Sequence, residues 1–161
     1  MTVNDLIAGS LQGSLGMLKM HVADFSDADL LVRPVPGANH ANWQLGHLIS
    51  SETQMMSACG AKMPDLPAGF ADRYTKDTAK LDDPAMFAPK AVLLAQLEKT
   101  RAATVAFAKT VSAEKLASPS PFMPEMFPST AALLAMSSSH DSMHMGQIQV
   151  LRRKLGKPLL F

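Results

Sequence analysis

The sequence has a single cysteine, Cys59, among 161 residues. One cysteine excludes an internal disulfide and any zinc site built from several thiolates, and it is compatible with a reducing compartment. The sequence also has almost no excess of charge of either sign, since its formal net charge is +1. No strong field would gather nucleic acid or an anionic membrane surface. We therefore expect neither as a partner.

Long hydrophobic runs are also missing. No stretch approaches about 18 consecutive apolar residues, and the first ten residues lack the basic start and apolar run of a signal peptide. We therefore expect a cytoplasmic protein. The sequence shows neither an alternating strand pattern nor an internal repeat of roughly 20 to 50 residues. Its length fits one domain of ordinary size, so we predict a single domain over residues 1–161.

What the sequence does contain is helical periodicity. Apolar residues recur every three or four positions over residues 3–22, 41–59, about 89–110 and 130–156, and capping residues or prolines stand at the ends of these stretches. Residues 60–88 have little periodicity, and the approach to the last helix is irregular because it holds four prolines, Pro119, Pro121, Pro124 and Pro128. We predict an all-α, four-helix bundle with two long connections, after helices two and three.

Three glycines mark the first predicted helix. Gly9, Gly13 and Gly16 lie on one side of it, where each glycine costs roughly 1 kcal/mol relative to alanine. Such positions let another backbone approach closely, either within the bundle or across a homodimer. A homodimer is therefore a prediction of the sequence.

Two histidines stand one turn apart on the apolar face of the last predicted helix. Side chains at i and i+4 lie about 5–6 Å apart at Cβ, so His140 and His144 can both reach one metal ion. A third histidine, His47, shares a face of the second helix with Trp43. The alternative is a group of hydrogen-bonded core histidines. We expect His40 at the surface or as a helix cap.

Three imidazoles around one ion leave a coordination position open for water or substrate, which is typical of catalytic rather than structural zinc sites. Imidazole ligands suit zinc, nickel, copper and iron alike. A zincin protease needs Glu directly after its first histidine, whereas Asp141 stands there. We expect Asp141 on the flank of the helix, either as a solvated charge or as a partner of an imidazole N–H.

The stretches PVPGANHANWQLGHLISSE and HDSMHMGQIQVLRRKLGKP, with their separation, resemble the DinB-like (YfiT-like) superfamily of metal-dependent bacterial proteins. The resemblance implies a four-helix bundle in which His47, His140 and His144 bind a divalent metal ion, usually zinc or nickel. Characterised relatives include transferases and isomerases that use glutathione, mycothiol or bacillithiol. In these enzymes the metal is thought to activate the thiol. The translesion polymerases that share the DinB name are unrelated.

The leading functional hypothesis is a metal-dependent enzyme that activates a low-molecular-weight thiol for S-transfer to a small electrophile. A hydrolase that uses metal-bound hydroxide is the first alternative. The second is a non-catalytic, metal-stabilised module for binding or dimerisation. The sequence does not assign catalytic or cofactor-binding residues beyond the three metal ligands.

Overall fold

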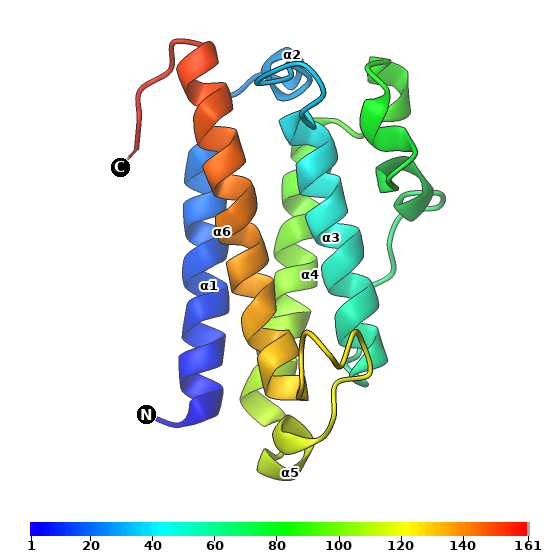
Figure 1. The fold of residues 1–161 in the computed structure, drawn as a ribbon, viewed down its shortest axis with the longest axis vertical. Coiled ribbons are helices and arrows are strands. Elements are labelled where there is room, and N and C mark those ends of the chain that lie inside the picture. Colours follow the sequence, from blue (N-terminus) through cyan, green and yellow to red (C-terminus); the bar gives the residue numbers. More distant parts are fainter. Residues whose placement is uncertain (161) are drawn as a thin grey trace.

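The protein is all-α in a computed structural model, which describes residues 1–160 and contains no strand among them (Figure 1). Its α-helices are α1 (Val3–Val22), α2 (Asp27–Leu30), α3 (Ala41–Ala58), α4 (Lys90–Thr110), α5 (Ala113–Ala117) and α6 (Thr130–Lys154). Three 3-10 helices, η1 (Ala71–Tyr74), η2 (Thr78–Lys80) and η3 (Pro84–Met86), lie between α3 and α4. The all-α prediction is confirmed.

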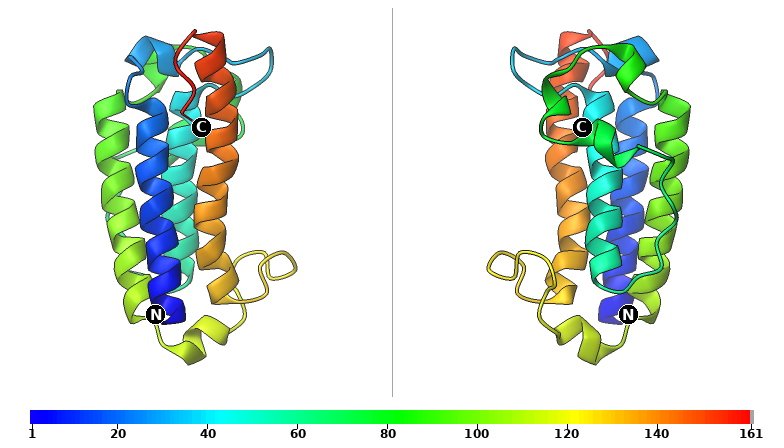
Figure 2. Two further views of the ribbon diagram at one scale, coloured as in Figure 1. Left: turned by 90° about the vertical axis from the view of Figure 1, so that its left-hand side faces the viewer. Right: turned by 90° about the vertical axis from the view of Figure 1, so that its right-hand side faces the viewer.

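The four long helices stand side by side, and their directions explain the long connection after α3. In Figure 1, α1 and α6 run upward, whereas α3 and α4 run downward. Each long helix contacts two others: α1 packs on α4 and α6, and α3 packs on the same two helices. Since α3 and α4 are parallel, residues 59–89 must return along the bundle before α4 can begin, as the two side views show (Figure 2).

Side-chain caps fix the helix starts. The Thr2 hydroxyl accepts the Asp5 N–H while the Asp5 carboxylate accepts the Thr2 N–H, which completes a capping box. The Ser129 hydroxyl accepts the Ala132 N–H at the start of α6. At the other end of α6, Gly156 adopts a φ of +65° that ends the helix.

Trp43 and Gly46 of α3 both help to anchor the connection between α3 and α4. The indole Nε1 of Trp43 donates a hydrogen bond to the Thr75 carbonyl at 3.0 Å. The Tyr74 ring packs so closely on Gly46 that a Cβ there would lie 2.2 Å from ring carbons. Any larger residue at Gly46 would therefore push η1 away from the helix.

The hydrophobic core consists of two clusters that are separated by a polar layer. One cluster surrounds Leu18, Ile49 and Leu97, and the other surrounds Leu11 and Leu133. Between them lie four buried polar residues that contact one another, one from each long helix: Ser14 of α1, Glu52 of α3, Arg101 of α4 and Asp141 of α6. We call these four residues the charged network.

The glycines of α1 do not serve packing within the bundle. A Cβ built on Gly9, Gly13 or Gly16 would meet no atom within 4 Å. The expectation that another backbone of this chain approaches them is therefore wrong, while their role between two copies of the chain stays a prediction. In residues 1–160, no helix combines the length and the apolar character needed to cross a membrane.

Candidate metal centre

The three predicted histidines meet between α3 and α6. A ligand nitrogen from each of His47, His140 and His144 lies within 4.8 Å of the other two. The Nε2 atoms of His140 and His144 face each other at 3.2 Å. His47 comes from the facing helix, and its ring centroid lies 5.2 Å from that of His140. Two antiparallel helices thus bring together residues that are about a hundred positions apart in the sequence.

These distances fit the geometry of a tetrahedral metal site. With metal–nitrogen bonds of about 2.0–2.1 Å, two imidazole nitrogens on one tetrahedral ion are separated by roughly 3.3 Å. The His140–His144 pair already stands at 3.2 Å. His47 would need to move closer by no more than about an ångström and a half on the same geometry. The residues present therefore fit a divalent ion.

Gln44 determines which nitrogen of His144 is available. Its Nε2 donates to the Asn39 carbonyl at 2.7 Å, which turns its Oε1 toward His144. That oxygen lies 2.9 Å from His144 Nδ1 and accepts its proton. The lone pair of His144 is consequently on Nε2, the atom that faces His140.

Trp43 and Ser51 determine how His47 lies. The indole and imidazole rings stack with centroids 4.8 Å apart and an angle of 6° between their planes. The Ser51 hydroxyl lies 3.4 Å from His47 Nδ1. When Nδ1 donates to this hydroxyl, the lone pair of His47 is on Nε2. Since Trp43 also bonds to Thr75, one side chain links the imidazole to the connection that borders the site.

All three imidazoles are held uncharged. Burial, followed by the influence of His140 and Lys76, lowers the pKa of His47 to about 4. Burial, with the influence of His140 and His47, lowers the pKa of His144 to about 3. Burial also lowers the pKa of His140, although the nearby Glu52 carboxylate opposes that shift. The lone pairs of the three imidazoles are thus free of protons at neutral pH.

A pocket of about 530 Å³ opens on His47. One wall is the polar face of α3, and the opposite wall is the stretch around η1 that Trp43 and Gly46 anchor. The α3 wall carries hydroxyl and amide groups from Ser50, Ser51, Thr53, Gln54 and Ser57. Because η1 belongs to the connection after α3, this connection forms part of the site. His144 is only 3% exposed and does not line this pocket, so of the three histidines it is His47 that borders it.

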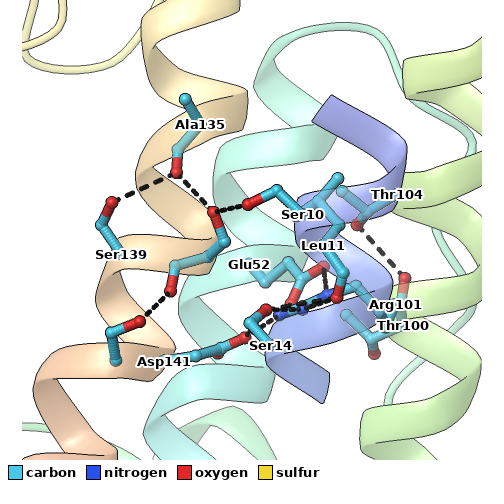
Figure 3. Close-up of polar contacts among 12 residues, drawn as sticks. Ser10, Leu11, Ser14, Glu52, Thr100, Arg101, Thr104, Ala135, Ser139 and Asp141 are labelled. Atoms are coloured by element: carbon cyan, nitrogen blue, oxygen red, sulfur yellow. Dashed lines mark hydrogen bonds and ion pairs between the residues drawn. The ribbon is translucent and has the colours of Figure 1, made fainter. Parts of the chain in front are cut away.

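Asp141 differs from its sequence-based expectation. It is 1% exposed; its Oδ2 accepts a hydrogen bond from Ser14 Oγ at 2.6 Å and forms an ion pair with Arg101 Nη2 at 2.8 Å (Figure 3). Its Oδ1 has no hydrogen-bond partner. The residue is therefore neither a solvated charge nor bonded to an imidazole. The reason is that the Asp141 side chain points from α6 toward Arg101 of α4 rather than toward solvent.

His40 also lies outside the histidine cluster. Its Nδ1 accepts the Trp43 N–H as the cap of α3, and its Nε2 donates to the Leu81 carbonyl at 3.2 Å. The cap prediction is confirmed, but the surface position is wrong because His40 is fully buried. The residue that the sequence reasoning missed is Gln44. Nothing in a single sequence distinguishes it from an ordinary glutamine on a helix surface.

Comparison with known proteins agrees with this geometry. A family model described as the DinB superfamily matches residues 10–148. The chain belongs to the DinB superfamily. The resemblance to this superfamily, which the sequence stretches around His47 and His140 indicated, is thereby confirmed.

Solved structures show the same fold. A crystal structure described as the conserved protein of a locus from Enterococcus faecalis matches with a TM-score of 0.71 and 19% identity, over 98% of this chain and 99% of that chain. At this identity the likeness concerns the fold alone. A search of curated proteins finds no match.

Proposed function

We propose that this DinB superfamily protein is a metal-dependent enzyme that activates a low-molecular-weight thiol for S-transfer to a small electrophile. The observation that carries the proposal is that three uncharged imidazoles converge beside an open pocket. Among residues 1–160, this group of ligands holds no fourth His, Cys, Asp or Glu. Structural zinc sites use four protein ligands, whereas catalytic sites use three and keep one position open.

Zinc or nickel bound by these ligands would lower the pKa of a thiol that reaches the open side, and so raise its thiolate fraction at neutral pH. The chain's own residues hold the imidazoles and shape the approach. Gln44 fixes the tautomer of His144, and Trp43 fixes the plane of His47. The small-molecule substrate would enter between the α3 wall and η1.

The transfer itself balances without another reactant when the electrophile carries a leaving group. With a halogenated nitroaromatic, a sulfur–carbon bond forms and the carbon–halogen bond breaks. The halide departs with the bonding electrons, and the thiol proton passes to solvent. Each turnover should therefore consume one thiol and release one halide ion.

The test measures thiol consumption and halide release by protein loaded with zinc or with nickel, using glutathione, mycothiol and bacillithiol in turn. We expect turnover that is lost in His47→Ala and retained in His40→Ala, since His40 is a buried histidine outside the cluster. Rates no higher than those of the metal-free protein would refute the transferase proposal for these thiols.

The hydroxyl-rich wall of the pocket favours a second candidate, a hydrolase acting on a polar ester or amide. That enzyme would release acid from such a substrate without any thiol. A protein that binds metal and gains thermal stability from it, yet supports neither reaction, would be a metal-stabilised binding module instead.

A further inference from the structure

The charged network adjoins the histidine cluster through both helices that carry the metal ligands. Asp141 directly follows His140 on α6, and Glu52 lies on α3 one and a half turns after His47. Arg101 of α4 joins them, because its Nε and Nη2 donate to the two Glu52 oxygens, each at 2.9 Å, and Nη2 also lies 2.8 Å from Asp141 Oδ2. Figure 3 shows this junction.

The network has more negative charge than positive. Two carboxylates face one guanidinium, so one negative charge is in excess while both carboxylates are ionised. Burial raises the pKa of Asp141, and the ion pair with Arg101 and the hydrogen bond from Ser14 oppose that shift. All three side chains are at most 4% exposed, so neither water nor salt screens that charge as it would at a surface. Burying an unbalanced charge is unfavourable, and a pairing that served stability alone would need only one carboxylate.

The second carboxylate is also incompletely satisfied. Asp141 Oδ1 has no hydrogen-bond partner although the residue is almost fully buried. The Glu52 carboxylate, in contrast, is held at both oxygens. A native structure rarely leaves a buried charged oxygen without a partner unless another group compensates it.

We propose that the excess negative charge of Glu52 and Asp141 serves the neighbouring histidine cluster, where it stabilises a bound divalent cation. The three imidazoles contribute no charge to the ion, so the network supplies the compensating charge that the ligands lack. Glu52 and Asp141 are thus positioning residues, not ligands.

This inference rests on the proposed metal site but not on the proposed reaction. Asp141→Asn is the most conservative test. The asparagine oxygen can occupy the place of Oδ2 and keep the contacts with Ser14 and Arg101, so that the charge is what the substitution removes. Glu52→Gln removes the same charge from the other helix and provides an independent second variant.

Asp24→Asn is the matched control. Asp24 also pairs with a buried arginine of α6, Arg152, at 2.6 Å. Arg152 follows His144 by eight residues, which places it about 12 Å away along the helix. Asp24 is itself 45% exposed, so its charge is screened before it reaches the histidines.

The measurement is the dissociation constant for Zn²⁺, by competition with a chromophoric chelator, together with urea unfolding of each metal-free protein. We expect Asp141→Asn and Glu52→Gln to weaken zinc binding by roughly 10- to 100-fold, as changes around metal ligands commonly do. Metal-free Asp141→Asn should be as stable as the parent protein or more stable. Asp24→Asn should bind zinc as the parent does.

An electrostatic effect should also scale with the charge of the ion. The logarithmic loss of affinity should be about twice as large for Zn²⁺ as for Cu⁺, because the Coulomb energy is proportional to charge. Unchanged zinc affinity in folded Asp141→Asn would overturn the inference and leave the metal site intact. Equal losses of affinity for Zn²⁺ and Cu⁺ would overturn the inference. Failure of both variants to fold without metal would do the same, because the network would then serve only the stability of the fold. A parent protein that binds no metal would overturn this inference and the proposed function together.

Discussion

The molecule contains two polar clusters at neighbouring levels of one bundle, and they differ in almost every physical respect. The histidine cluster is uncharged, joins two helices and borders a pocket. The charged network joins all four long helices and lies between two apolar clusters. Its charged side chains are paired with one another, whereas the histidine cluster has no opposite charges to pair. This pairing, rather than polarity alone, distinguishes the cluster that holds the helices together from the one that can bind an ion.

The comparison also shows how the two clusters satisfy their polar atoms. In the charged network, Arg101 donates to Leu11 O, Ser14 Oγ and Glu52, and it pairs with Asp141. In the histidine cluster, the Nε2 atoms of His140 and His144 lie within hydrogen-bond distance of each other, at 3.2 Å, so one ring can donate to the other in the metal-free protein. A cation can replace that shared proton and be bound by both nitrogens.

Arg101→Met should break the charged network and give the largest loss of stability. It leaves two buried carboxylates without their cation, which typically costs about 3–5 kcal/mol. Arg152→Met is the matched control, since Arg152 is equally buried but its partner Asp24 is half exposed and can be solvated. Urea unfolding of the metal-free proteins measures both. A loss for Arg101→Met no greater than that for Arg152→Met would contradict the difference drawn between the two regions.

His144→Ala should have the opposite consequences. It should greatly weaken zinc binding and change the stability of the metal-free protein only slightly. It removes one of three ligands, so the loss of zinc affinity should exceed the roughly 100-fold upper range for residues around a metal site. Calorimetric titration with zinc measures the change, and circular dichroism checks the fold. The control, His40→Ala, should lose a helix cap and keep zinc affinity. Zinc affinity retained in His144→Ala would exclude this residue as a ligand.

Acid should destabilise the metal-free protein through the histidine cluster. An unfolded histidine titrates near pH 6.5, whereas His144 in the fold titrates at about 3. Between these values the unfolded chain binds more protons, so stability falls as pH decreases. Urea unfolding should show a loss of about 2 kcal/mol from this group between pH 7 and 5. In His144→Ala the decline should be smaller, and an identical pH dependence would show that this imidazole is not held uncharged.

The sequence was sufficient for the histidine cluster because its members obey a simple pattern. His140 and His144 are one turn apart on an apolar face, and His47 occupies a comparable face of another helix. Helical spacing alone therefore predicts that His140 and His144 lie on the same face of their helix, and that His47 lies on the corresponding face of its own. The four long helices were predictable for the same reason, since their periodicity and caps are local properties.

The charged network could not be predicted in this way. It takes a single polar residue from each of four helices, and a lone Asp141 or Glu52 looks like any solvated helix charge. Their burial depends on the register and rotation of all four helices, which are set by packing rather than by local sequence. The orientation of Gln44 depends in addition on the carbonyl of Asn39 in the preceding loop.

Variants of Gln44 test the smallest expected effect, that of a residue that positions a metal ligand without binding the metal itself. Gln44→Ala removes the acceptor of the His144 Nδ1 proton, so the imidazole can rotate or exchange tautomers, and we expect about tenfold weaker zinc binding. Gln44→Glu keeps an acceptor for the Nδ1 proton but loses the donor to the Asn39 carbonyl, so its zinc affinity should fall less than that of Gln44→Ala. Trp43, the protein's single tryptophan, stacks on His47, so its fluorescence can follow the titration. If Gln44→Glu lost as much affinity as Gln44→Ala, the hydrogen bond would not be what positions the ring.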